Sequence, residues 1–199
     1  MRYYRADEET EASEALAAAL RFSSDIDVNP HGWRWTLIAL HSAVQGFMVL
    51  SLRHGNGLLA LSPKCLAAWL TAHEAGLGAY PHEKLDTYLG LYAKVKNKQH
   101  GTVGGNERFV PKGSQGRNIK RLHTLRNEFV HFTPKGWSLE ICGLPRIVID
   151  CLALISFLGW ETPNIFWHNQ DASESARSSH LQLAQQMHQL DAAYSSTKD

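Results

Sequence analysis

Residues 122–132, with the sequence LHTLRNEFVHF, place leucine or phenylalanine at spacings of three and four residues. At about 100° per residue on a helix, these apolar side chains fall within one stripe roughly 80° wide. The stripe consists of Leu122, Leu125, Phe129 and Phe132. Because Pro134 disfavours helical geometry at the residue before it, we expect a core-facing helix over residues 115–132 that ends there.

The polar residues of this segment lie away from the stripe. Asn127 and His131 are four residues apart and lie one turn above the other, while Arg126 lies at the stripe edge, about 140° from His131. A long guanidinium side chain can bridge that gap. Arginine matches two phosphate oxygens, and a histidine with a pKa near 6.5 can move a proton at neutral pH. The segment therefore predicts a site that holds a phosphate and transfers a proton.

The spacing from arginine to histidine is weak evidence by itself. With the arginines and histidines of this chain, roughly two such pairs are expected by chance. Arg34 with His41, and Arg117 with His123, also satisfy it, and we interpret both as accidental. A surface helix with a solvated polar side is the alternative to a functional role for Arg126 and His131.

Residues 122–137 resemble the signature helix of the higher eukaryote and prokaryote nucleotide-binding (HEPN) superfamily, whose motif is arginine, a polar residue such as asparagine, a few residues and histidine. Here the motif reads Arg126, Asn127 and, four residues later, His131. The resemblance implies an all-helical, commonly dimeric fold and either a metal-independent ribonuclease of a toxin–antitoxin or phage-defence system, or an inactive member. It also implies RNA as substrate and a possible antitoxin protein as partner.

The chemistry that fits these residues is cleavage of RNA by its own 2′-hydroxyl, with no metal and no cofactor. His131 would take or donate the proton, Arg126 would stabilise charge on the phosphorane, and Asn127 would orient His131 or hold the phosphate. A single histidine is few for a reaction that needs an acid and a base. We therefore expect a homodimer with two motifs across a shared cleft. A non-catalytic nucleotide-binding, RNA-binding or dimerisation module remains the alternative.

The segment before the motif helix is strongly basic. Residues 94–121 hold eight lysines and arginines against the single acid Glu107. We predict RNA-binding residues near the helix start, namely Lys112, Arg117, Lys120 and Arg121. A mobile, solvated loop is the alternative. Glycines at 101–105 lack the strand and the Lys-Ser/Thr of a phosphate-binding loop, which argues against nucleotide hydrolysis.

Helical patterns recur along the chain and strand patterns do not. We expect an all-α, antiparallel bundle of six to seven helices in one domain, residues 1–199, with residues 1–7 and 195–199 disordered. The final helix could dock on the bundle or on another subunit. The expected helices are residues 8–22, 30–52 with Asn29 as N-cap, 65–75 with Ser62 and Pro63 before them, 85–95, 115–132, 138–160 with Ser138 as cap, and a last helix opened by an Asp171–Glu174 capping box.

Composition indicates an ordinary soluble protein. The 199 residues are 44% hydrophobic and 20% charged, with a net charge of +1, enough for one sizeable core. Cys65, Cys142 and Cys151 lack the spacing of a zinc site or a disulfide framework, which favours a reducing cytoplasm. The acidic N-terminus has no apolar signal region, and the apolar run 36–52 is interrupted by polar residues, so we expect no membrane partner.

Several further residues invite a functional interpretation. His73 and Glu74 begin a zinc-protease pattern that fails at Leu77, so no metal site is predicted. For Asp150, within an apolar helix, a pairing with a core Arg or His and a position on the helix's wet edge are both open, and we favour the wet edge. Trp33, Trp35 and Trp137 are interpreted as core or interface anchors.

Overall fold

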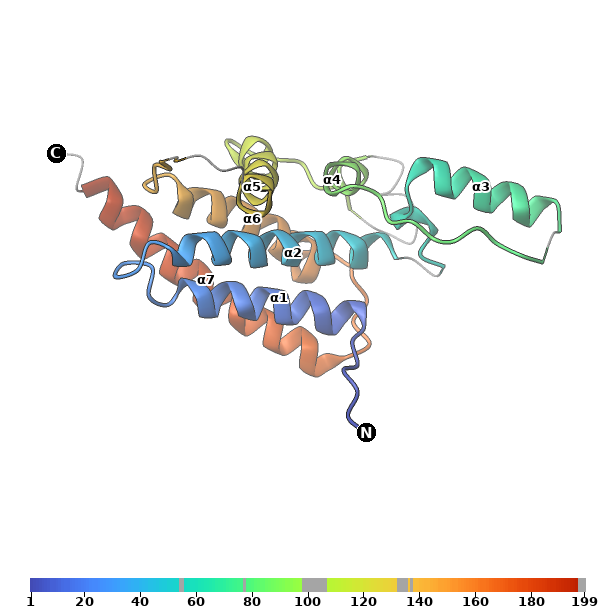
Figure 1. The fold of residues 1–199 in the computed structure, drawn as a ribbon, viewed down its shortest axis with the longest axis horizontal. Coiled ribbons are helices and arrows are strands. Elements are labelled where there is room, and N and C mark those ends of the chain that lie inside the picture. The colour runs from blue at the N-terminus through green and yellow to red at the C-terminus, as the bar shows by residue number, and fades with distance from the viewer. Residues whose placement is uncertain (54–55, 77, 98–106, 132–135, 137, 197–199) are drawn as a thin grey trace.

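The computed structural model describes residues 1–53, 56–76, 78–97, 107–131, 136 and 138–196, and within them the chain is all-helical, as predicted (Figure 1). Their only β-type pairing is an isolated bridge between Leu61 and Leu85. The helices are α1 (Glu8–Ser23), α2 (Gly32–Leu52), α3 (Pro63–Glu74), α4 (Tyr88–Val95), α5 (Gln115–Val130), α6 (Leu144–Ser156) and α7 (Gln170–Ser196), with short helical segments η1 (Leu58–Ala60) and η3 (Phe157–Glu161).

Helix α2 forms the centre of the bundle. It packs against α1, α4, α5 and α6, and its inward residues Leu37, Leu40, Val44 and Phe47 are fully buried. Figure 1 shows α1 and α2 as a lengthwise antiparallel pair, with α4 and α5 seen nearly end-on on the other side of α2. The motif helix α5 therefore crosses α2 and places its residues against the middle of that helix.

The length and apolar character of α2 also meet the criteria for a membrane-spanning helix. Among the described residues it is the one helix that does so, and 67% of its most apolar 18-residue stretch is buried inside the fold. A core helix passes the same test, so this finding is weak evidence for a membrane span. Burial by neighbouring helices on several sides accounts for its apolar composition.

The two helices nearest the N-terminus approach closely at one point. A Cβ atom added at Gly46 of α2 would lie 2.9 Å from the Cβ of Ala12 in α1. Real Cβ atoms do not come so close, so α1 and α2 pack at this distance because residue 46 is glycine. The contact fixes the start of α1 beside α2, where both helices line a cavity described below.

The predicted Ser62 cap is confirmed, and the boundaries of α1, α4 and α5 lie within three residues of the predicted ones. Helix α1 begins and ends within one residue of the expected range, and the Ser62 hydroxyl accepts a hydrogen bond from the Cys65 N–H at the start of α3. Helix α4 begins at Tyr88, three residues later than expected, where the Thr87 hydroxyl accepts from the Gly90 N–H. Helix α5 ends at Val130, with His131 as its C-cap.

Other boundaries correct the predictions. Helix α2 begins at Gly32, and the Asn29 side chain accepts from the His31 N–H in the turn before it. Helix α6 begins at Leu144 and not near Ser138, because Pro145 has no N–H and fits only in a first turn. Helix α7 continues to Ser196, beyond the expected disorder from residue 195; residues 197–199 lie outside the described residues.

The start of α7 is held by a carboxylate from α1. Glu9, which is buried, accepts hydrogen bonds from the N–H groups of His168 and Asn169 and from His168 Nδ1. The Asn169 side chain then caps the helix by accepting from the Ala172 N–H, so the predicted Asp171–Glu174 capping box is wrong. Helix α7 packs on α1 and α6, which places it on the bundle of its own chain.

Candidate active site

The motif occupies the last two turns of α5. Leu122, Leu125 and Phe129 of the predicted stripe are buried, whereas Phe132 lies outside the described residues. His131 is the C-cap, with a ψ of 48° that departs from helical geometry, and its N–H donates to the Asn127 carbonyl at 2.9 Å. The His131 side chain is exposed and forms no hydrogen bond or ion pair with the described residues.

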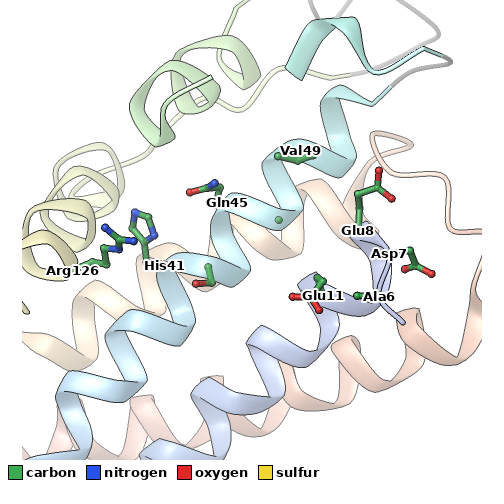
Figure 2. Close-up of a pocket in the computed structure, with 10 residues that line it drawn as sticks. Ala6, Asp7, Glu8, Glu11, His41, Gln45, Val49 and Arg126 are labelled. Atoms are coloured by element: carbon green, nitrogen blue, oxygen red, sulfur yellow. The ribbon is translucent and has the colours of Figure 1, made fainter. Parts of the chain in front are cut away.

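Arg126 is half-buried and faces α2. Its Nη1 donates to Asn127 Oδ1 at 3.1 Å, and its side chain lines a cavity of about 680 Å³. Figure 2 shows the guanidinium beside His41 of α2 at one end of this cavity. His131 is not among the residues that line it. Within one chain, the structure therefore brings Arg126 and Asn127 together and does not bring His131 to the same cavity.

Two other histidines, His41 and His123, lie beside the motif residue Asn127. Asn127 Nδ2 lies 3.1 Å from His123 Nε2, one turn back on α5, and His123 Nδ1 lies 3.0 Å from Nε2 of His41. The ring of Tyr88 from α4 stacks on both imidazoles, with centroids 4.1 Å from His41 and 5.1 Å from His123. The two histidines that sequence analysis interpreted as accidental therefore meet each other and the motif.

The contact between His41 and His123 joins residues 82 positions apart in the sequence, so residue spacing could not predict it. One part of the cluster did have a local signal. His123 precedes Arg126 by three residues and Asn127 by four, which places it on the same side of α5. A search of helix neighbours on both sides of Arg126 would have found His123, but not His41.

Burial and positive charge keep these histidines neutral. Desolvation lowers the pKa of His41 to about 3, with smaller contributions from the Arg126 and His123 charges. Desolvation and the Arg126 guanidinium also lower the pKa of His123 below its ordinary value of 6.5. At neutral pH both imidazoles therefore present one N–H donor and one lone pair.

The cavity has ends of opposite charge. Arg126 and His41 line one end, and carboxylates from the start of α1 line the other, with Gln45 of α2 between them (Figure 2). Ser42 and Gly46 of α2 also line the cavity. The carboxylates belong to Asp7, Glu8 and Glu11. All three have partners: Asp7 accepts from the Thr10 N–H as the N-cap of α1, Glu8 pairs with Arg53 at 3.4 Å, and Glu11 accepts a hydrogen bond from the Tyr4 hydroxyl. The cavity can hold a ligand with an anionic group at one end and hydrogen-bond donors at the other.

The predicted RNA-binding residues lie on the surface near the start of α5. Lys112, Arg117, Lys120 and Arg121 are all exposed, and Arg121 lies 3.9 Å from Glu128 in an exposed ion pair. Such a pair contributes little to stability. Lys120 precedes His123 by three residues, so these cations continue along α5 toward the histidines.

The basic residues upstream have a different role. Lys94 is mostly buried, pairs with Asp86 at 2.7 Å and donates to the Leu61 carbonyl at 2.5 Å. The Lys96 ammonium lies 4.4 Å from the centre of the Tyr92 ring. The Lys94 hydrogen bond to Leu61 ties α4 to the segment that follows η1. Lys98 and the glycines at 101–105 lie outside the described residues, so their predicted role stays untested.

Asp150 is buried in a closed polar cluster. Its Oδ2 accepts hydrogen bonds from the Ser114 hydroxyl at 2.6 Å and from Asn118 Nδ2 at 2.7 Å, and Arg146 lies 3.7 Å from its Oδ1. The favoured interpretation of Asp150 as the wet edge of α6 is therefore wrong. Its hydrogen-bond partners, Ser114 and Asn118, come from the start of α5, which Asp150 therefore fixes against α6.

A second cavity of about 330 Å³ adjoins the C-terminal end of α5. Its lining includes His31, Trp33, Arg34 and Phe129. Arg34 Nη2 donates to the Phe129 carbonyl at 3.1 Å, which links the start of α2 to the C-terminal end of α5. Trp33 is buried in the core as predicted, whereas Trp35 is half-exposed with the Arg34 guanidinium over its ring; Trp137 lies outside the described residues.

The cysteines are free thiols, and burial raises the pKa of Cys151, so its thiol stays protonated. Among the described residues, no group of three or more His, Cys, Asp or Glu side chains is arranged to hold a metal ion.

No family model, no curated protein and no solved structure matches the chain. The resemblance to the HEPN superfamily therefore rests on the sequence around Arg126 and stays a prediction.

Proposed function

We propose that this protein is a HEPN-like endoribonuclease that cleaves RNA through attack of the 2′-hydroxyl, without a metal. The observation that carries the proposal is the position of Arg126: a half-buried guanidinium with neutral histidines beside it, on the motif helix, at the end of a cavity of about 680 Å³. A cavity of this size is suited to one nucleotide of a longer strand.

Arg126 supplies the charge that the reaction needs. The scissile phosphate gains negative charge as the 2′-oxygen attacks phosphorus, and a partly desolvated guanidinium stabilises that charge more strongly than one in bulk water. One of its five N–H donors binds Asn127, which leaves the others for phosphate oxygens. Arg126 forms no ion pair with a carboxylate among the described residues, so no neighbouring anion competes with the phosphate.

The proton steps need one base and one acid. The base takes the proton of the 2′-hydroxyl, the 2′-oxygen bonds to phosphorus, and the bond to the 5′-oxygen breaks as the acid protonates it. The products are a 2′,3′-cyclic phosphate and a 5′-hydroxyl. His131 is the proton carrier by resemblance. Because His131 does not line the cavity with Arg126 in one chain, the proposal requires a homodimer in which His131 of a second subunit reaches that cavity. That histidine would carry one of the two proton transfers, and a water molecule would carry the other.

RNA would approach along the exposed cations of α5. Arg117, Lys120 and Arg121 lie on the surface that leads to His123 and Asn127, and Lys112 lies just before the helix. Contacts of these residues with phosphates would hold the strand in register without reading its sequence. Function as a toxin or phage-defence effector in the cytoplasm, controlled by an antitoxin protein, is part of the proposal and rests on the resemblance alone.

A non-catalytic RNA-binding or dimerisation module is the second candidate. The observation that favours it is the hydrogen bond from Arg126 to Asn127, which holds part of the guanidinium within its own chain. A module would bind RNA through the same cations and leave it intact.

The test uses purified protein, end-labelled RNA, and EDTA in half of the reactions. The proposal predicts cleavage in both halves, a 2′,3′-cyclic phosphate at the new end, and no cleavage at a position that carries a 2′-deoxyribose. Arg126→Ala and His131→Ala are compared with wild type, with circular dichroism as the check on folding. Binding without cleavage by wild type supports the module, and full activity of His131→Ala removes that residue from the mechanism.

A further inference from the structure

A chain of hydrogen bonds runs from Arg126 through Asn127 and His123 to His41, and each bond in it has only one possible direction. A guanidinium only donates, so Asn127 Oδ1 must be the acceptor of Arg126, and Asn127 Nδ2 must point at His123. The amide nitrogen donates, so His123 Nε2 carries the lone pair and His123 Nδ1 carries the proton. That proton is donated to Nε2 of His41, whose own proton is therefore on Nδ1.

This chain of hydrogen bonds can form only when both imidazoles are neutral. A proton added to His123 Nε2 would face the Asn127 amide hydrogens at 3.1 Å, two donors pointed at each other. The amide could then accept from His123 only by turning its oxygen away from Arg126, which would break the bond that holds the guanidinium. The arginine side chain is therefore coupled to the protonation state of a histidine it does not contact directly.

The surroundings of the two histidines favour the neutral state. Tyr88 of α4 covers both rings, and its hydroxyl is directed to the Ile119 carbonyl and not to either imidazole. The charged groups near them are Arg126 on α5 and, across the cavity from His41, the carboxylates Asp7, Glu8 and Glu11. Lys120, one turn before His123 on α5, is exposed. Burial and the nearby guanidinium lower the pKa of both histidines.

We propose that His123, held by His41, is a positioning residue of the ribonuclease: it fixes the Asn127 amide and, through it, holds the Arg126 guanidinium toward the cavity. This inference rests on the proposed function and adds a role that the motif residues alone do not define. His123 acts through Asn127 and carries no proton of the reaction.

Two substitutions separate positioning from proton transfer. In His123→Gln, the amide offers one acceptor for Asn127 and one donor for His41, as the neutral imidazole does, but it does not titrate. In His123→Leu, neither hydrogen bond exists. We expect His123→Gln to keep kcat within a few-fold of wild type at pH 7.5, and His123→Leu to lose about 100-fold, the scale of a misplaced catalytic group.

The pH dependence of the cleavage rate is a second test, because it would be the same in wild type and His123→Gln if His123 had only a structural role. Wild-type cleavage should fall in acid as His123 becomes protonated, and His123→Gln should lack that contribution to the acidic limb. Loss of activity in His123→Gln as large as in His123→Leu would overturn the positioning role and make His123 a proton carrier. Full activity of folded His123→Leu would overturn any role.

A measurement independent of cleavage keeps the inference separate from the proposed function. Nitrogen-15 NMR of the imidazoles distinguishes the two tautomers. We expect both His41 and His123 to be neutral and protonated on Nδ1 at pH 7, and His123 to change tautomer in Asn127→Ala. A His123 protonated on Nε2 in wild type would overturn the proposed hydrogen-bond chain. If wild type does not cleave RNA, the proposed function fails, and this spectrum alone decides whether the hydrogen-bond chain exists.

Discussion

Helix α5 carries a polar cluster at each end, and the two differ in what they leave unsatisfied. At its start, the Asp150 carboxylate accepts from Ser114 and Asn118, and the donors are matched by a buried anion. At its end, His41, His123, Asn127 and Arg126 form a chain that contains a cation and no carboxylate. The first cluster is closed and holds α5 on α6, whereas the second opens onto a cavity.

The difference separates stability from function. A buried charge that is fully paired is costly to disturb, but it has nothing left to offer a ligand. The Arg126 guanidinium, held by an amide, has further N–H donors to offer, and it forms no ion pair with a carboxylate among the residues that the structure describes. A phosphate in the cavity can supply an anionic partner. We therefore expect substitutions at the end of α5 to lower the cleavage rate and substitutions at its start to lower the free energy of unfolding.

The largest expected effect is on cleavage by Arg126→Ala. Removal of a preorganised donor at the phosphate lowers kcat by about 10² to 10³-fold. Because Arg126 is only half-buried and forms no ion pair with the described residues, the thermal midpoint should change little. Single-turnover cleavage and a melting curve measure the two quantities. Arg177→Ala, an exposed arginine on α7, is the matched control and should retain wild-type activity.

The second effect is on stability, through Asp150→Ala. Its loss leaves the buried Asn118 amide and the Ser114 hydroxyl without their acceptor, so the free energy of unfolding should fall by about 1 to 3 kcal/mol. Urea unfolding measures it, with Asp171→Ala, exposed at the start of α7, as the control. An unchanged midpoint would show that the cluster is not the closed anchor described here.

The third effect is a pH dependence of stability from the open cluster. The pKa of His41 is about 3 in the folded protein and 6.5 when exposed, so the unfolded chain binds more protons between these values. The contribution of neutral His41 to the free energy of unfolding is fully present above pH 6.5. It is lost as pH falls, by at most about 1.4 kcal/mol per pH unit. His123 and His180, whose pKa values burial also lowers, act in the same direction.

Urea unfolding of wild type and His41→Gln between pH 5 and 6.5 isolates the His41 contribution. The variant should show a shallower fall in stability, whereas His188→Gln, an exposed histidine of α7, should follow wild type. The window stays above the ordinary carboxyl range, where protonation of Glu9 would add a further loss. Burial alone would raise the pKa of Glu9, but its hydrogen bonds from Asn169 and His168 lower it.

The smallest effect concerns the exposed cations that precede the open cluster. Lys120→Gln should weaken binding of uncleaved RNA equally for all sequences and reduce the slope of log affinity against log salt by about 0.7 to 1. Fluorescence anisotropy with a 2′-O-methyl RNA measures this slope. Lys64→Gln, an exposed lysine on α3, is the control. An unchanged slope in Lys120→Gln would remove that residue from the RNA contacts.

The apolar pattern predicted the fold better than it predicted the site. Leu122, Leu125 and Phe129 are buried as their spacing indicated, because one side of a helix must face the core. Pro145 limits the start of α6, a local signal that the prediction of a Ser138 cap overlooked. The fold class followed from such local rules.

The site depends on contacts between helices. His41 meets His123 because α5 crosses the middle of α2, and no spacing within either helix encodes that crossing. Asp150 was assigned to a wet edge because its partners, Ser114 and Asn118, lie on another helix. Arg126 and Asn127 were identified from the motif, whereas the geometry around them required the fold.

The most direct test of the central claim is cleavage of one labelled RNA, in EDTA, by wild type and by Arg126→Ala at matched folded concentration. The account predicts a 2′,3′-cyclic phosphate product from wild type and at least a 100-fold slower reaction in the variant. Equal rates for the two proteins, or intact RNA with both, would contradict it.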